Sequence, residues 1–388
     1  MANGKVVSEI MCIGRDTRTL TPSDKRRIVT LVEALAAKKG LGKALTTLWE
    51  KQKEIGFILG TPCTRENAND RSQFLCRKVG RYWLIHSPAR KDRGNVPKLK
   101  RVGIMAKHAR FVYESDDVNP YLHHPVEGEG FTRKCHLCSA AGAFPKEVLL
   151  PIELGKAGFL YGANFATLGH SHFTLWTEVP ILQKYWPMDS LRWLCEHGDR
   201  LHCAEYSTFF NGLGAGNSLR HFHYQTLREP LPVFDAPCSR NFGASGIQRL
   251  EWPMPVYRLV VTRGNKRLAG LQRLDAFILA WLNMARHNTL NLAHRKDDAK
   301  NTHLIFIPRL DKDGYHHPKE ITNDFAGCEV CGRINVENRQ EWEQVVGLAR
   351  KRQEPRQPPP DVDKMLRDIG PPDKAIERLE SSLLVKDR

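Results

Sequence analysis

Residues 219–227 alternate between polar and bulky side chains, the pattern of a strand with one buried face. Side chains at i, i+2 and i+4 share one face of a strand, so His221, His223 and Gln225 are expected to point the same way. The two aromatic residues between them are expected to point into the core. Two imidazoles and an amide on one face form a candidate chemical site, and an ordinary structural role is the alternative.

The pattern elsewhere predicts a mixture of helices and strands. Helices are predicted at residues 21–40, 41–55, 187–201 and 271–286. Strands are predicted from residue 81 and at residues 172–176, 256–262, 290–292 and 303–308. Because alternating strand patterns occur on both sides of residue 235, we expect an α+β fold made of a pair of halves, with antiparallel sheets and packed helices.

A glycine-rich segment leads into the histidine-bearing strand: Gly212, Gly214 and Gly216, followed by Asn217 and Ser218. Glycines let the backbone curl so that its N–H groups can surround an anion, and the two polar residues add side-chain donors. One imidazole can attack phosphorus while the amide holds a phosphate oxygen, so this segment suits phosphoryl chemistry. A Rossmann or P-loop site is disfavoured, because both need a helix directly after the loop.

The charge of the chain favours anionic partners. Its 388 residues carry Lys+Arg 59 against Asp+Glu 43, a formal net charge of +16, and 41% of them are hydrophobic. Such a balance attracts nucleotides, polyphosphates or nucleic acid, and a solvated basic surface is the alternative. No apolar run reaches the ~18 residues of a membrane span, and the N-terminus lacks a signal-peptide pattern. We therefore expect a cytoplasmic protein with reduced cysteines and no membrane partner.

The segment His221-Phe222-His223-Tyr224-Gln225 resembles the His-x-His-x-Gln signature of the histidine-triad-like superfamily's transferase branch. That branch includes galactose-1-phosphate uridylyltransferase, diadenosine tetraphosphate phosphorylase and the GDP-hexose phosphorylases. The resemblance implies tandem histidine-triad-like halves and a catalytic set of His223, His221 and Gln225. His223 would be the nucleophile that carries a covalent nucleotide, Gln225 would donate to a phosphate oxygen, and His221 would orient the loop or bind metal.

Shorter resemblances to the same branch imply the substrate contacts. The stretch from Trp83 to Arg90 resembles the uridylyltransferases' Trp-x-Leu-x-Ser-Pro-x-Arg, whose Arg meets phosphate. Other stretches resemble the phosphorylases' Asn-x-Phe, their Asn-x-Gly lead-in and the Arg of their second half. The substrate-binding residues so implied are Asn164, Phe165, Asn211, Gly214, Gly216, Asn217, Ser218, Arg90 and Arg309.

Cys135 and Cys138 form a Cys-x2-Cys pair, the spacing of two zinc ligands. The uridylyltransferases carry such a pair, completed by a His after the next strand and by the first His of the motif. This chain has Glu178 after that strand. A second pair, Cys328 and Cys331, offers a four-cysteine site as an alternative. Zinc is thus the one expected cofactor, and no organic cofactor is expected.

Four segments are expected along the chain. Residues 1–75 form a helical N-terminal extension, and residues 76–232 form the catalytic half. Residues 233–345 form a second, degenerate half without the His-x-His-x-Gln motif. Residues 346–388 form a Pro-rich and charged tail with a short helix after Pro372.

The function expected from these features is nucleotidyl transfer or phosphorolysis through a covalent nucleotidyl-histidine. The substrate would be a nucleoside diphosphate sugar or a dinucleoside polyphosphate, and the acceptor a phosphate or a sugar phosphate. The alternatives are a histidine-triad-type nucleotide hydrolase and a nucleic-acid-binding or deadenylating protein. Scattered basic residues argue against nucleic acid. The sequence leaves open which base is transferred and whether the chain forms a homodimer.

Overall fold

The fold described below is that of a computed structural model. It describes residues 2–15, 19–58, 75–87, 137, 146–164, 167–179, 181–217, 221–262, 264, 266–299, 301–311, 318, 321, 324–346 and 361–384. Among these residues, no helix is both long enough and apolar enough to cross a membrane.

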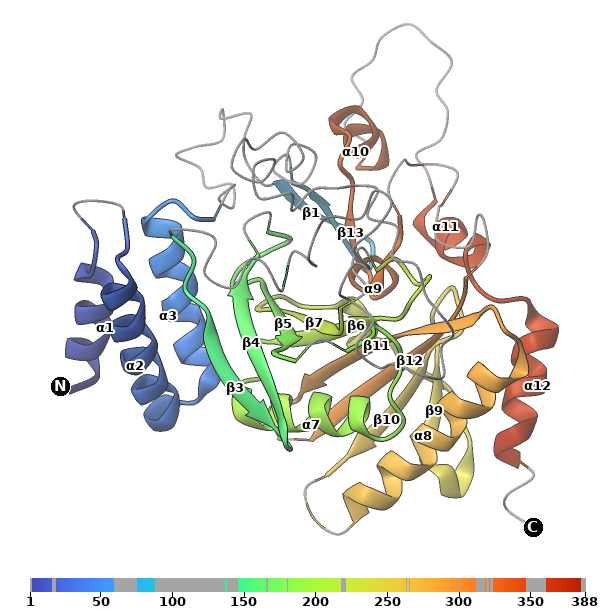
Figure 1. Ribbon diagram of the computed structural model, residues 1–388. Helices are drawn as coiled ribbons and strands as arrows, with labels where there is room; N and C mark the ends of the chain where they lie inside the picture. Colours follow the sequence, from blue (N-terminus) through green and yellow to red (C-terminus); the bar gives the residue numbers. More distant parts are fainter. Residues whose placement is uncertain are drawn as a thin grey trace, which may run out of the picture.

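A ten-stranded antiparallel sheet runs through the centre of the molecule (Figure 1). Its strands lie in the order β3-β4-β5-β7-β6-β11-β12-β10-β9-β8. The first five strands along the chain are β3 (Leu150–Leu154), β4 (Ala157–Ala163), β5 (Phe173–Thr177), β6 (Ser207–Asn211) and β7 (His223–Leu227). The other five are β8 (Cys238–Asn241), β9 (Ile247–Leu250), β10 (Tyr257–Val261), β11 (Asn288–Lys296) and β12 (Thr302–Leu310).

The two halves of this sheet have the same topology. In each, three strands follow one another as hairpins, a helix crosses over, and two more strands complete the half. The crossover helices are α7 (Asp189–Leu201) and α8 (Lys266–Met284). The halves meet where β6 pairs with β11, with Phe210 opposite Leu292. The predicted α+β fold with antiparallel sheets and packed helices is confirmed.

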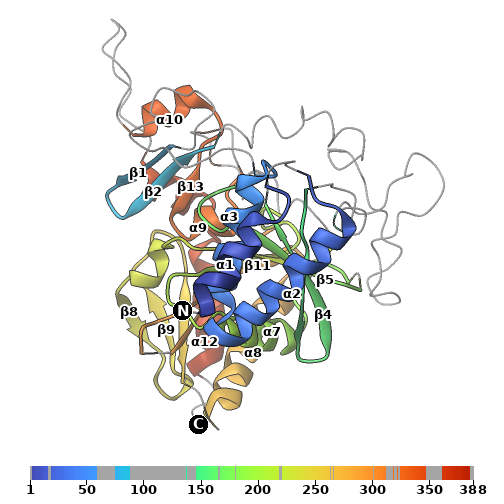
Figure 2. The same ribbon diagram turned by 90° about the vertical axis from the view of Figure 1, so that its left-hand side faces the viewer.

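The two faces of the sheet are covered differently. Helices α7 and α8 cover one face (Figure 1). The aromatic residues of β4, β7, β10 and β12 pack against them there. On the other face lie α9 (Gly327–Val330) and a three-stranded sheet of β1 (Leu75–Val79), β2 (Tyr82–His86) and β13 (Arg333–Asn335). This small sheet and α10 (Arg339–Val345) lie at the top of both views (Figures 1 and 2).

Three N-terminal helices pack beside β3 (Figure 1): α1 (Ala2–Cys12), α2 (Pro22–Lys39) and α3 (Leu41–Glu54). A capping box between Thr21 and Asp24 starts α2, as its sequence predicts, because each residue satisfies the other's backbone N–H. The apolar faces of these helices join the main core through Trp49 and Leu48. The predicted helices at residues 21–40 and 41–55 are therefore confirmed, and they belong to the body of the protein.

The C-terminal segment also returns to the body. The helix α11 (Val362–Asp368) packs on the small sheet, where the Tyr82 hydroxyl donates to Asp363. The helix α12 (Asp373–Leu384) docks at the far end of the large sheet, where buried Glu380 accepts from Arg249 at 2.8 Å and Tyr257 at 2.9 Å. The short helix expected after Pro372 is present, and its apolar residues are part of the core.

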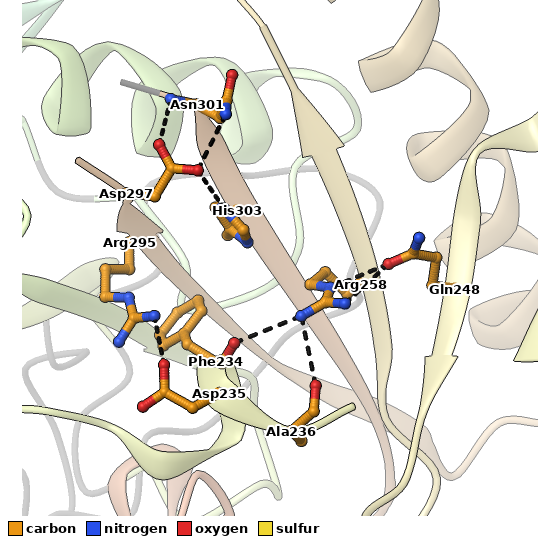
Figure 3. A network of polar contacts seen from close by, with 9 residues as sticks. All are labelled: Phe234, Asp235, Ala236, Gln248, Arg258, Arg295, Asp297, Asn301 and His303. Carbon is orange, nitrogen blue, oxygen red and sulfur yellow. Dashed lines mark hydrogen bonds and ion pairs between the residues drawn. The ribbon is translucent and has the colours of Figure 1, made fainter. Parts of the chain in front are cut away.

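Polar contacts fix the segment that joins the two halves (Figure 3). This segment contains a short 3-10 helix, η2 (Pro232–Asp235). Arg295 of β11 binds Asp235 at 2.7 Å and lies over the ring of Phe234. Arg258 of β10 donates to the Phe234 carbonyl at 3.4 Å and to Gln248 of β9 at 3.0 Å. The link is therefore held against the second half by β9, β10 and β11.

Candidate active site

The strand β7 presents His223 and Gln225 on the sheet face away from α7 and α8. Between them, Tyr224 points to the helices, where it is fully buried and its hydroxyl donates to the Ser190 carbonyl at 2.7 Å. Because successive side chains of a strand alternate, His223 and Gln225 lie on the opposite face. Trp176 of β5 is opposite His223 in the register.

The ring of His223 is held in one tautomer. Its Nδ1 lies 2.7 Å from the backbone carbonyl of His221, an acceptor, so Nδ1 carries the proton and donates. In the neutral ring Nε2 then carries the lone pair, and this is the nitrogen that can attack an electrophile. Only 3% of the residue is exposed, so the ring is held within the protein interior.

Gln183 holds the backbone of His223 in place. Its Oε1 accepts from the His223 N–H at 2.6 Å, and its Nε2 donates to the His223 carbonyl at 3.0 Å and to the Asn211 carbonyl at 2.8 Å. The amide thus bridges β7 and the end of β6. This role of Gln183 does not follow from the sequence, because its partners are 28 and 40 residues away along the chain.

His221 lies outside the strand that was expected to contain it. The strand β7 begins at His223, and His221 forms an isolated bridge with Leu182. Its Nε2 lies 2.7 Å from the Thr177 carbonyl, so Nε2–H donates there. In the neutral ring the lone pair is therefore on Nδ1, the one nitrogen that could serve as a metal ligand.

The glycine-rich segment is tightly packed. Gly214 and Gly216 have φ values of +73° and +81°, which disfavour other residues. A Cβ on Gly216 would come within 2.7 Å of the Ala326 Cα. The Gly212 N–H donates to the Leu290 carbonyl at 2.9 Å, and the Gly214 N–H donates to Asn217 Oδ1 at 3.0 Å. These two amides serve the protein itself, which differs from the expectation that they would be open to an anion.

A buried polar network lies beneath this segment. Asn211 Oδ1 accepts from the Gly327 N–H at 2.8 Å and from Asn291 Nδ2 at 3.0 Å. Arg309 donates to Asn291 Oδ1 at 2.8 Å and to the Phe325 carbonyl at 3.0 Å. Arg309 is 0% exposed, and burial lowers its pKa to about 10. Its guanidinium therefore binds protein groups, which differs from the substrate contact expected from the sequence.

The remaining expected site residues are placed only in part. Asn164 follows β4, and its N–H donates to the His172 carbonyl at 2.8 Å. His172 is two residues before Thr174, which is opposite Gln225 in the sheet. Five others lie outside the described residues: Arg90, Cys135, Cys138, Phe165 and Ser218. Within the described part of the chain, no group of three or more His, Cys, Asp and Glu side chains could hold a metal ion. Cys328 and Cys331 are buried there.

Glu147 is a buried carboxyl on the same face of the sheet as His223. It is 7% exposed, and its Oε2 has no hydrogen-bond partner among the described residues. A Cβ on Gly162 would come within 2.9 Å of its Oε1 and 2.7 Å of the Trp176 ring, so a larger residue would displace both. Burial raises the pKa of Glu147 to about 8, against a smaller opposing effect of Lys25.

The raised pKa of Glu147 predicts how the stability of the protein depends on pH. Its folded pKa of about 8 lies above the ordinary value of 4.5, so between these values the folded state holds a proton that the unfolded state has lost. Stability therefore falls as pH rises, by up to about 1.4 kcal/mol per pH unit. Glu147→Gln, which cannot titrate, is expected to lose this slope. Urea unfolding of both proteins at about pH 6.5 and 7.5 measures it; equal slopes would contradict the buried carboxyl.

No protein-family model matches the chain, and no curated protein is detectably similar in sequence. Solved structures of yeast Ap4A phosphorylase Apa2 are similar in fold. The complex with Ap4A has a TM-score of 0.52 and 14% identity, covering 86% of this chain and 98% of that chain. The complex with AMP has a TM-score of 0.51 and 14% identity, covering 84% and 94%. At such identities the likeness shows the fold alone, and this chain has the α+β fold found in that phosphorylase.

Proposed function

We propose that this protein is a nucleotidyltransferase that cleaves a dinucleoside polyphosphate through a covalent nucleotidyl-histidine on His223. The observation that carries the proposal is the tautomer of His223. Its Nδ1–H donates to the His221 carbonyl at 2.7 Å, which leaves the lone pair on Nε2, on the same face as the Gln225 amide. A nucleophile whose second nitrogen is fixed by a hydrogen bond and an amide donor beside it suit attack on phosphorus.

The reaction has two displacement steps. In the first, Nε2 of His223 forms a bond to the α-phosphorus, and the bond from that phosphorus to its bridging oxygen breaks. The departing nucleoside polyphosphate keeps the electron pair. In the second, an oxygen of inorganic phosphate attacks the α-phosphorus, and the histidine leaves with its lone pair restored. Gln225 donates to a non-bridging oxygen, whose charge grows in each step.

The identity of Gln225 favours transfer over hydrolysis. An amide cannot deliver a proton, so the leaving group must be stable without one, as a polyphosphate is. The covalent nucleotidyl-histidine then persists until it reacts with an acceptor that is already anionic. The likeness in fold to a phosphorylase whose structures carry Ap4A and AMP supports a dinucleoside polyphosphate as the first substrate to test. A nucleoside diphosphate sugar is the other candidate.

Mass spectrometry of the intact protein tests the proposal. The protein is incubated without phosphate with Ap4A, with guanosine and uridine analogues, and with nucleotide sugars. A mass increase of one nucleotidyl group (a nucleoside monophosphate less water), mapped to His223 and removed by added phosphate, is expected for at least one substrate. Turnover of a substrate without an adduct would contradict the covalent route and favour a hydrolase that uses water.

Replacing Gln225 by alanine should slow the formation of this adduct. Loss of one transition-state donor typically lowers a rate by roughly a hundredfold to a thousandfold. The nucleophile remains, so the adduct should still reach the wild-type amount at long times. Quench-flow of the adduct measures the rate. A wild-type rate would mean that Gln225 does not contact the reacting phosphate.

Zinc remains a prediction. We propose Cys135 and Cys138 as two of its thiolate ligands, with His221 Nδ1 as a further candidate, since Nε2 donates to Thr177. Bound zinc would supply structural cross-linking of distant segments. Metal analysis of the purified protein should give about one zinc per chain, and Cys135→Ser should lower that amount. An unchanged zinc content in this variant would exclude the pair as ligands.

A further inference from the structure

His172 lies between the backbone of Leu168 and the side chain of Gln225. It directly precedes β5 and is 0% exposed. Its Nδ1 lies 3.0 Å from the backbone nitrogen of Leu168, and its Nε2 lies 3.0 Å from Oε1 of Gln225. The ring therefore connects a fixed turn of the chain to a side chain of the candidate site.

These two contacts determine the direction of each hydrogen bond. A backbone N–H is always a donor, so Nδ1 of His172 must accept from Leu168 and carry no proton. In the neutral ring the proton is then on Nε2, which donates to Gln225. The atom of Gln225 that accepts must be the carbonyl oxygen, since the NH2 group is a donor only. The orientation of the amide thus follows from the backbone and not from a choice between similar atoms.

The turn that carries Leu168 is itself held firmly. Arg333 of β13 is 1% exposed and donates to the Leu168 carbonyl through Nε at 3.2 Å and Nη2 at 3.1 Å. Glu229 accepts from the His170 N–H at 2.9 Å and lies 3.3 Å from Arg333. Because both sides of the turn are bound, the Leu168 N–H has a fixed position and direction. His172 therefore has little freedom to change its tautomer or its rotamer.

We infer that His172 is a positioning residue that locks the amide of Gln225 with its carbonyl toward the ring and its NH2 group toward the transferred phosphate. This inference rests on the proposed function of the site. An unlocked amide could rotate by half a turn and present its carbonyl oxygen to the phosphate. Two oxygens would then face each other, and the donor that stabilises the growing charge would be lost.

Two substitutions of His172 separate its two hydrogen bonds. In His172→Asn, the side-chain oxygen can still accept from the Leu168 N–H, but the side chain is too short to reach Gln225. In His172→Gln, the longer side chain can place an NH2 group where Nε2 was and donate to Gln225. We expect the first variant to form the adduct about tenfold more slowly, the rate equivalent of one neutral hydrogen bond. The second variant is expected to recover most of that loss.

Two measurements distinguish positioning from a general structural role. Substrates with sulfur replacing one α non-bridging oxygen exist as two diastereomers, and a fixed Gln225 donor should make their rates differ. His172→Asn should reduce this ratio and His172→Gln should restore it. In addition, His172→Asn combined with Gln225→Ala should be no slower than Gln225→Ala alone, because both changes remove the same donor. Fully additive losses or an unchanged diastereomer ratio would overturn the inference.

A nitrogen NMR spectrum of the resting protein tests the lock without turnover. With labelled histidine, His172 should show a protonated Nε2 and a bare Nδ1, and Gln225→Ala should shift the Nε2 signal. A proton on Nδ1 would overturn the inference whatever the protein catalyses. If no substrate gives an adduct, the proposed function fails by itself, and the inferred hydrogen bond is still decided by this spectrum.

Discussion

His223→Ala is expected to abolish the nucleotidyl adduct and the turnover that depends on it. In the proposed mechanism Gln225 contributes a donor, whereas His223 forms the covalent bond to phosphorus, so loss of His223 removes the pathway and does not merely slow it. The fold should survive, because Gln183 holds residue 223 through its backbone N–H and carbonyl, which alanine retains. His223→Gly leaves space for an imidazole, so a preformed nucleotide imidazolide is expected to restore transfer to phosphate.

Adduct mass and turnover of Ap4A measure this effect, with His202→Asn as the control. His202 is exposed at the end of α7 with φ of +50°, a conformation that asparagine tolerates. The control should react at the wild-type rate. If His223→Ala accumulates an adduct on His221, the roles of the two histidines are exchanged. That result would require the Nε2–H of His221 to leave the Thr177 carbonyl, which it binds at 2.7 Å.

Arg309→Ala is expected to lower the free energy of unfolding by about 3 kcal/mol or more, because a buried cavity forms and two acceptors lose their donor. Those acceptors are Asn291 Oδ1 and the Phe325 carbonyl. Removing a buried charge offsets part of the loss, which is why the figure stays below the sum of the separate effects. The network also reaches the glycine-rich segment, since Asn291 donates to the Ala215 carbonyl at 3.0 Å.

Urea unfolding measures this loss, and Arg286→Ala is the matched control. Arg286 is exposed and precedes β11, so its removal should leave the stability within roughly 0.5 kcal/mol of the wild type. Arg309→Lys should also destabilise, since an ammonium cannot reach both acceptors as a planar fork does. An Arg309→Ala protein of normal stability with weakened substrate binding would restore the substrate contact that the sequence suggested.

Local periodicity allowed much of the fold to be predicted from sequence. The helices at residues 21–40 and 41–55 follow from short-range signals: the capping box of Thr21 with Asp24 starts the first, and Gly40 separates the two. The inward Tyr224 and outward Gln225 follow from the strand period alone. The start of β7 could not be obtained in this way, because the chain before it bridges to Leu182 instead of continuing the ladder. The placement of His221 therefore depends on a distant partner.

The candidate site was predicted by residue type but not by hydrogen-bond partner. A glycine pattern shows that the backbone turns sharply, but it does not show that Leu290 and Asn217 accept the amides. Likewise, an arginine near the end of a strand can face substrate or the interior, and only the packing of α9 and β11 around Arg309 distinguishes the two. His172 carried a signal in the sequence, since it stands directly before a strand, but its link to Gln225 spans 53 residues.

The pairing of β6 with β11 has a consequence for synthesis on the ribosome. Asn211 and Asn291 are 80 residues apart, yet they are neighbours in the sheet and in the network beneath the glycine-rich segment. At ~5–20 residues per second, the edge of β6 stays unpaired for roughly 4 to 16 s after it emerges. All five residues of β6 are buried in the folded protein, so its unpaired edge can pair with a wrong strand before β11 is made. A chaperone that shields this edge would raise the yield of native protein without contacting His223, the proposed nucleophile.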